Sequence, residues 1–245
     1  MNLLKKIGFS LLSLGLSSGV FASDEKKLYI NTSPVHYSME RPRASGENDL
    51  LEMTVNEKLE EGWFYVKYKS GKEIWKDCTD SQTTASAILD FDEIHEVINK
   101  DLEELSFYHF HPNIIEEKDV KKNEKLDYSQ LPSNEDFKVC LQLHDRIINF
   151  YPEHMMKIDC KIAVSTGIYT IKIHPSVIIL GKRVEEFNKA LAIISQEMFL
   201  AEIGINKEFD YVMTNKDKFS EMNKNFAKKF STDVLKIDFE EKAYK

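Results

Sequence analysis

The chain has 245 residues, of which 42% are hydrophobic and 30% charged, and its formal net charge is −8 at pH 7. This length suits one domain with elaborations or two small domains, and we expect one. The net charge is negative, and the sequence has no stripe of Lys and Arg that could follow a phosphate backbone. We therefore do not expect nucleic acid as a partner.

The N-terminus has the layout of a secretory signal peptide. Lys5 and Lys6 precede an apolar run at residues 7–21, and small residues lead to a cleavage site expected after Ala22. The run is short for a membrane anchor, which needs about 20 apolar residues. We therefore expect residues 1–22 to be removed, and no membrane span in the mature chain. The mature protein is expected in the periplasm or outside the cell.

The first part of the mature chain is predicted to hold a helix and a hairpin. Residues 23–47 are expected to form an N-terminal extension with a short strand at Leu28–Asn31. Asp49–Glu61 has the apolar spacing of a helix. Aromatic and β-branched runs at Trp63–Lys69 and Glu73–Asp77 flank a Ser-Gly pair, which indicates a hairpin.

The middle of the chain is predicted to run from a helix into a strand. Phe91–Leu105 has helical spacing and leads into the strand Ser106–His111, which ends at Pro112. Residues 113–130 are mostly charged, so we expect a solvated insertion. Loops of this kind can also act as lids, and both readings stay open.

A helix is predicted to start near Ser133, with apolar residues on one face as far as Tyr151. Two β-rich runs, Ile158–Ser165 and Ile168–His174, flank Thr-Gly and indicate a second hairpin.

The remainder, residues 176–245, is expected to be a helical C-terminal elaboration. Its predicted helices lie near 184–203 and 219–230, and a last strand is predicted at Val234–Phe239. These helices either cover the core or form a surface for a partner.

Three cysteines remain after export, namely Cys78, Cys140 and Cys160. An oxidising compartment permits one disulfide, and Cys140 with Cys160 is the favoured pair because a helix and the following strand can pack together. The alternative is that all three are small buried apolar residues.

Two histidines at alternate positions of one predicted strand are the strongest chemical signal. His109 and His111 project from the same face, so both imidazoles can reach one metal ion. A catalytic zinc has three protein ligands and one position for water. Asp136 is the candidate for the third ligand, because Ser133 at the start of the helix places it in the first turn.

Each half of this pattern also has a purely structural explanation. Ser-x-x-Asp before an apolar helical run is close to an ordinary capping box. Alternating histidines on a strand are often surface residues. In combination, with Pro112 and the following helix in place, they indicate a metal site. His144 is interpreted as a helix-face residue.

The order His-x-His-Pro followed by Ser-x-x-Asp resembles the JAMM motif of the JAB/MPN peptidases and isopeptidases. The matching residues are His109, His111, Pro112, Ser133 and Asp136. The likeness covers roughly residues 48–175. It implies an α/β (α+β) fold, with a curved mixed sheet flanked by helices in cytidine-deaminase-like layers.

The sequence departs from the family pattern in two places. Phe110 stands between the histidines where the family has Ser or Thr, and residues 113–130 lengthen the gap to Ser133. On a strand, Phe110 points away from the two imidazoles, so the metal face can tolerate it.

The resemblance also implies a Zn²⁺ cofactor and hydrolysis of a peptide or isopeptide bond by a metal-activated water. A Glu ahead of a Gly near the first strand acts as general base in this family. Glu61 is the corresponding choice here, and Glu60 and Glu73 are alternatives. Ser133 would help to stabilise the oxyanion. The substrate is then a peptide or protein, and the alternative function is a catalytically inactive MPN-like binding module.

Overall fold

The computed structural model describes residues 44–57, 60–82, 87–90, 93–112, 131–151, 158–202 and 216–242. The expected signal peptide, most of the N-terminal extension including the strand at Leu28–Asn31, and the charged insertion 113–130 lie outside the described residues.

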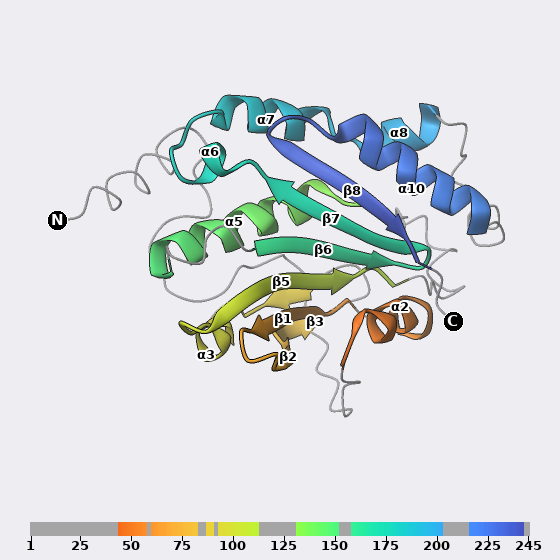
Figure 1. Ribbon diagram of the computed structural model, residues 1–245. Coiled ribbons are helices and arrows are strands. Elements are labelled where there is room, and N and C mark those ends of the chain that lie inside the picture. Colours follow the sequence, from red (N-terminus) through yellow and green to blue (C-terminus); the bar gives the residue numbers. More distant parts are fainter. Residues whose placement is uncertain are drawn as a thin grey trace.

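A six-stranded mixed sheet forms the centre of the fold (Figure 1), with strand order β2-β1-β5-β6-β7-β8. The pairing of β5 with β6 is parallel, and the other four pairings are antiparallel. The strands are β1 (Gly62–Tyr68), β2 (Glu73–Asp77), β5 (Leu102–Phe110), β6 (Ile158–Val164), β7 (Gly167–Ile173) and β8 (Leu235–Glu241). A separate short ribbon pairs β3 (Thr79–Gln82) with β4 (Ala87–Leu89).

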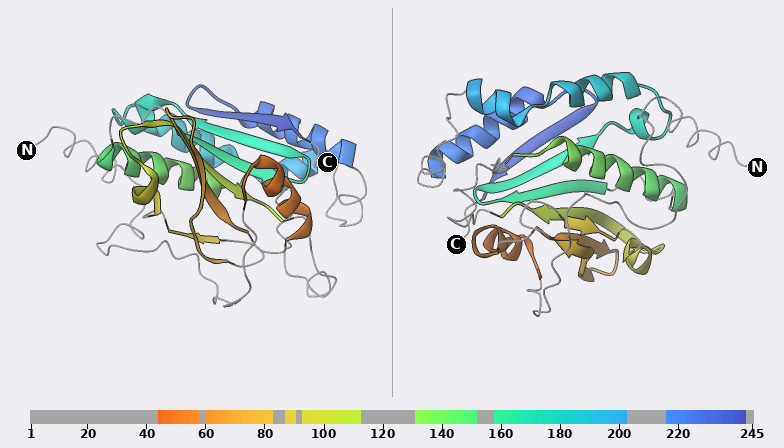
Figure 2. Two further views of the ribbon diagram at one scale, coloured as in Figure 1. Left: turned by 60° about the horizontal axis from the view of Figure 1, so that its bottom comes forward. Right: turned by 180° about the vertical axis from the view of Figure 1, so that it is seen from behind.

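Helices flank this sheet, as the two views in Figure 2 show. They are α2 (Glu47–Asn56), α3 (Ile94–Val97), α5 (Asn134–Phe150), α6 (Pro175–Ile178), α7 (Val184–Ile193), α8 (Gln196–Glu202) and α10 (Lys216–Phe230). None of the helices in the described ranges is long and apolar enough to cross a membrane.

The two faces of the sheet belong to different hydrophobic clusters. Alternate residues of a strand face opposite sides, and β5 illustrates this: Phe107 packs in the larger cluster, whereas Tyr108 and Phe110 pack in the smaller one. The larger cluster includes buried residues of α5, α7 and α10, and the smaller one includes Leu50 and Leu51 of α2. Phe110 therefore lies on the α2 side, as the strand period predicts.

The parallel pair β5–β6 positions the candidate site. Parallel neighbours cannot be joined by a tight turn and need a crossover, usually through a helix. Here α5 is that helix, and Phe137, Cys140, Leu143 and Ile147 bury its apolar side in the larger cluster. The start of α5 is thereby brought back to the end of β5.

Several predicted elements are confirmed. The first hairpin is β1–β2, and Gly71 in its turn has φ 82°, a left-handed conformation suited to glycine. The second hairpin is β6–β7, and the helix starting after Ser133 is α5. The predicted helix at Asp49–Glu61 is shorter, because α2 ends at Asn56.

The predicted helix Phe91–Leu105 is wrong for most of its length. Within it, α3 spans only Ile94–Val97, and β5 already begins at Leu102. The helical spacing of its apolar residues was misleading, because Leu102 and Leu105 are buried by strand pairing with β1. The predicted helix at 184–203 is likewise two helices, α7 and α8, separated at Ile194 and Ser195.

The C-terminal third is more than a helical elaboration. Its last strand, β8, pairs along its whole length with β7 and so completes the central sheet. Gly167 permits this pairing, because a Cβ atom there would lie 2.2 Å from the backbone oxygen of Glu240. The expected boundary at residue 175 therefore cuts through one continuous sheet.

Candidate metal centre

The two predicted histidine ligands lie side by side at the end of β5. His109 is in the strand, and His111 follows it, with its backbone N–H donating to Ala163 O at 2.9 Å. Their Nε2 atoms are 2.8 Å apart, and the residues are 8% and 4% exposed. At this distance one nitrogen must donate a proton to the other, or both must share a cation.

Asp136 reaches the same point from the first turn of α5. Its Oδ1 lies 3.1 Å from His109 Nε2, and its Oδ2 lies 3.8 Å from His111 Nε2. The carboxylate is also held by the helix cap, since Ser133 N donates to Oδ2 at 2.5 Å. The capping box is therefore real, but it orients the carboxylate toward the histidines instead of excluding it from the site.

The surroundings keep the Asp136 carboxylate ionised. Burial by itself would raise the pKa of Asp136, but the charge and hydrogen bonds of His109 and His111 outweigh burial and hold this pKa well below its usual range. An ionised carboxylate at this position can serve as the third ligand of a divalent cation.

The three residues fit a metal ion. One ligand atom from each of His109, His111 and Asp136 lies within 4.8 Å of the others, so this buried group can hold a cation. Tetrahedral zinc, with bonds of about 2.0–2.1 Å to nitrogen, places two ligand nitrogens about 3.3 Å apart. The imidazoles must therefore separate by about half an ångström to accept it, a small side-chain rotation.

Ser133 lies at the N-cap of α5. Its Oγ accepts a hydrogen bond from Asp136 N at 3.4 Å. Its observed role is therefore to fix the first turn of the helix. Because the hydroxyl oxygen is the acceptor in this bond, the hydroxyl hydrogen can still donate to another group.

Among the three candidate bases, Glu61 is placed nearest to the histidine strand. It is 2% exposed and immediately precedes Gly62, which pairs directly with His109. Glu60 is half-buried and one residue further away. Glu73 is exposed and pairs with Lys67, at the opposite end of β1 from Gly62 and roughly 16 Å along it. Glu73 therefore lies far from His109, and the geometry favours Glu61 over Glu73 as the candidate base.

The interpretation of His144 as a helix-face residue missed its surroundings. It is 5% exposed, its Nδ1 lies 2.7 Å from Cys140 O, and it hydrogen-bonds the side chain of Cys160. A signal was available in the sequence: Asp136, Cys140 and His144 follow one another at intervals of four, so they share one face of a helix.

Two other described histidines, His95 and His174, have partners outside the group of His109, His111 and Asp136. His95 Nδ1 is 2.7 Å from Tyr151 Oη, and His174 caps α6 through Ser176 N. His36 and His154 lie outside the described residues.

The chain was compared with known protein families, curated proteins and solved structures. No protein-family model, curated protein or solved structure matches the chain. The functional argument therefore depends on the residues of the site and their geometry.

Proposed function

We propose that this protein is a zinc-dependent hydrolase of the JAMM type that cleaves a peptide or isopeptide bond. The supporting observation is the convergence of His109, His111 and the Asp136 carboxylate on one point, in the order in which the JAMM motif supplies its ligands. The mixed sheet and the crossover helix that follows the histidine strand agree with such a fold.

Zinc is the proposed metal because the ligands are two imidazoles and one carboxylate, a donor set found in catalytic zinc sites that keep an open position. When bound, the metal would polarise the scissile carbonyl and lower the pKa of an attacking water to about 7.

The protein's own residues would do the remaining work. Glu61 would take a proton from the attacking water and deliver it to the leaving amine. The Ser133 hydroxyl would donate to the oxygen that becomes negative in the tetrahedral intermediate. Asp136 remains both cap and ligand, so the position of the metal depends on the start of α5.

The substrate class follows from the reaction and from the expected export. An amide bond in a peptide or protein outside the cytoplasm is the proposed target, and the mature protein is proposed to act in the periplasm or outside the cell. The runner-up function is a binding module that keeps the metal but lacks a working base.

Metal content of the mature protein is the first test. We expect one zinc per chain by inductively coupled plasma mass spectrometry, and its loss in His109→Ala and Asp136→Asn. His95→Ala, which changes an imidazole outside the cluster, is the matched control. Stoichiometric iron in place of zinc, or zinc retained by both variants, would exclude the proposed centre.

Activity separates the hydrolase from the binding module. Zinc-loaded protein is assayed against a peptide library and an isopeptide-linked substrate, with Glu61→Gln beside it. For a hydrolase we expect cleavage that Glu61→Gln reduces by at least 100-fold at unchanged zinc content. Zinc binding with no cleavage by either protein would favour the binding module.

A further inference from the structure

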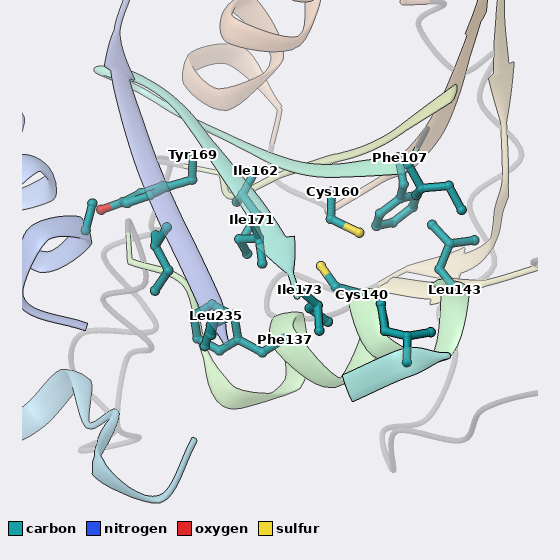
Figure 3. Close-up of a cluster of buried hydrophobic side chains, with 14 of the residues drawn as sticks. Phe107, Phe137, Cys140, Leu143, Cys160, Ile162, Tyr169, Ile171, Ile173 and Leu235 are labelled. Carbon is teal, nitrogen blue, oxygen red and sulfur yellow. The ribbon is translucent and has the colours of Figure 1, made fainter. Parts of the chain in front are cut away.

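Close to the group of His109, His111 and Asp136, two cysteines from different elements face each other. Cys140 comes from α5 and Cys160 from β6, and Figure 3 shows their sulfur atoms pointing toward one another, with Phe107 beside Cys160. Both residues are buried, at 2% and 1% exposure. In the structure both are thiols, as is Cys78.

The two thiols lie close enough to interact. Cys140 and Cys160 share a side-chain hydrogen bond, and His144 makes a second one to Cys160. Burial would raise the pKa of Cys160, but these two hydrogen bonds and the charge of His144 lower it to about 6, whereas burial keeps the pKa of Cys140 raised. Cys160 is thus the thiol of the pair that ionises more readily, and Cys140 is the one that keeps its proton more strongly.

We propose that Cys140 and Cys160 are oxidised to a disulfide that ties α5 to β6, one helical turn along α5 from Asp136. The pair is contributed by the crossover helix and by the strand next to the histidine strand, so the bond would lock the element that carries Asp136 onto the sheet. The effect on Asp136 rests on the proposed metal site, whereas the formation of the disulfide does not.

The oxidant is a disulfide of the extracytoplasmic or refolding environment, such as glutathione disulfide. Cys160 loses its proton, and its thiolate attacks one of the two glutathione sulfurs. The glutathione thiolate that is expelled takes up a proton, and a mixed disulfide remains on Cys160. Cys140 then loses its proton and attacks Cys160 Sγ, which expels the second glutathione. The protein loses two electrons and two protons, and one glutathione disulfide becomes two thiols. Because both sulfurs are buried, we place this exchange during folding.

The location of the pair gives the bond its structural effect. Cys140 follows Asp136 by four residues, one helical turn, on the same side of α5. The closed loop has about 20 residues, and cross-links of this size stabilise mainly by restricting the unfolded chain. In the folded chain, the bond would restrain the turn of α5 next to the carboxylate ligand.

The test uses wild-type mature protein, unfolded and reduced, then refolded with glutathione and glutathione disulfide. The product is denatured, alkylated with iodoacetamide, digested and analysed by mass spectrometry. We expect a linked pair of peptides containing Cys140 and Cys160, with only Cys78 alkylated. Alkylation of all three cysteines, or a link to Cys78, would overturn the proposal.

Two further measurements address the effect of the bond. Dithiothreitol should lower the Tm of wild type and of Cys78→Ala by roughly 5–10 °C, and should not shift the Tm of Cys140→Ala. Zinc affinity should be about 10-fold weaker in the reduced protein, because the turn that carries Asp136 is then held less firmly. Equal affinity in the two forms would overturn the role in positioning Asp136.

The outcomes also separate this inference from the proposed function. A linked Cys140–Cys160 pair in a protein that binds no zinc would support the disulfide and refute the metal site. Zinc bound by protein with three alkylatable thiols would refute the disulfide and leave the metal site intact.

Discussion

Oδ1 of Asp136 lies 3.1 Å from Nε2 of His109, although a charged segment of chain separates the two residues. The same carboxylate closes the capping box of α5 through its other oxygen. One side chain therefore links the start of a helix to the end of a strand, and the predictions below that concern the site follow from this double role.

Zinc should stabilise the folded protein through Asp136. At a free zinc concentration about 100 times Kd, binding adds about 2.7 kcal/mol to the free energy of unfolding. For a domain of this size the Tm should rise by roughly 5–10 °C. Asp136→Asn should abolish the rise in a thermal melt, whereas Glu135→Gln, which changes an exposed neighbour paired with Lys138, should keep it. An unchanged rise in Asp136→Asn would mean that zinc binds elsewhere.

Ser133→Ala should weaken both the helix and zinc binding at the proposed site. Loss of an N-cap costs about 1 kcal/mol, and a carboxylate that loses its orientation should bind zinc about 10-fold more weakly. The matched control is Ser195→Ala, because Ser195 Oγ accepts from Met198 N at 3.3 Å and caps α8 in the same way. Urea unfolding should show a loss of stability in both variants. Zinc titration should show weaker binding in Ser133→Ala alone. Equal zinc affinity in the two variants would show that the cap does not support the ligand.

Glu47 should make the stability of the protein depend on pH. Its carboxylate accepts from Tyr108 Oη at 2.5 Å and pairs with Lys161 and Lys242. Burial opposes ionisation, but these partners outweigh it, so the pKa of folded Glu47 lies below its ordinary value of 4.5. Stability from this group is therefore present above pH 4.5 and is lost as the pH falls through the lower, folded pKa.

Glu47→Gln should consequently lower the free energy of unfolding by about 1–2 kcal/mol at pH 7. The difference from wild type should shrink as the pH falls from 5 to 3, as measured by urea unfolding at each pH. Glu52→Gln, on the exposed side of α2, is the control and should differ little from wild type at any pH. A difference that stays constant with pH would contradict the assigned role of the Glu47 charge.

Gly167→Ala should disturb the pairing of β7 with β8. The new methyl group would lie 2.2 Å from Glu240 O, a backbone atom that cannot rotate away. We expect a loss of about 3 kcal/mol in unfolding free energy. Gly46→Ala, where no atom lies within 4 Å of the added Cβ, should cost about 1 kcal/mol or less. Equal losses in the two variants would show that β8 can shift without penalty.

Local patterns were sufficient for much of the fold. The strand period placed His109 and His111 on one face and Phe110 on the other, and both hairpins and the helix after Ser133 follow from short-range signals. The helical spacing at Phe91–Leu105 failed because apolar residues buried by strand pairing can fall at helical intervals by chance.

The sequence by itself determined which side chains were available for a metal site: two imidazoles on one strand face and a carboxylate in the first turn of a helix. Only the tertiary structure decided that they meet, because the parallel pairing of β5 with β6 requires α5 to return to the end of the histidine strand. It also decided that β8 belongs to the central sheet, that Glu73 lies far from the site, and that Cys140 faces Cys160. Such contacts depend on strand order, and the local spacing of residues carries no information about that order.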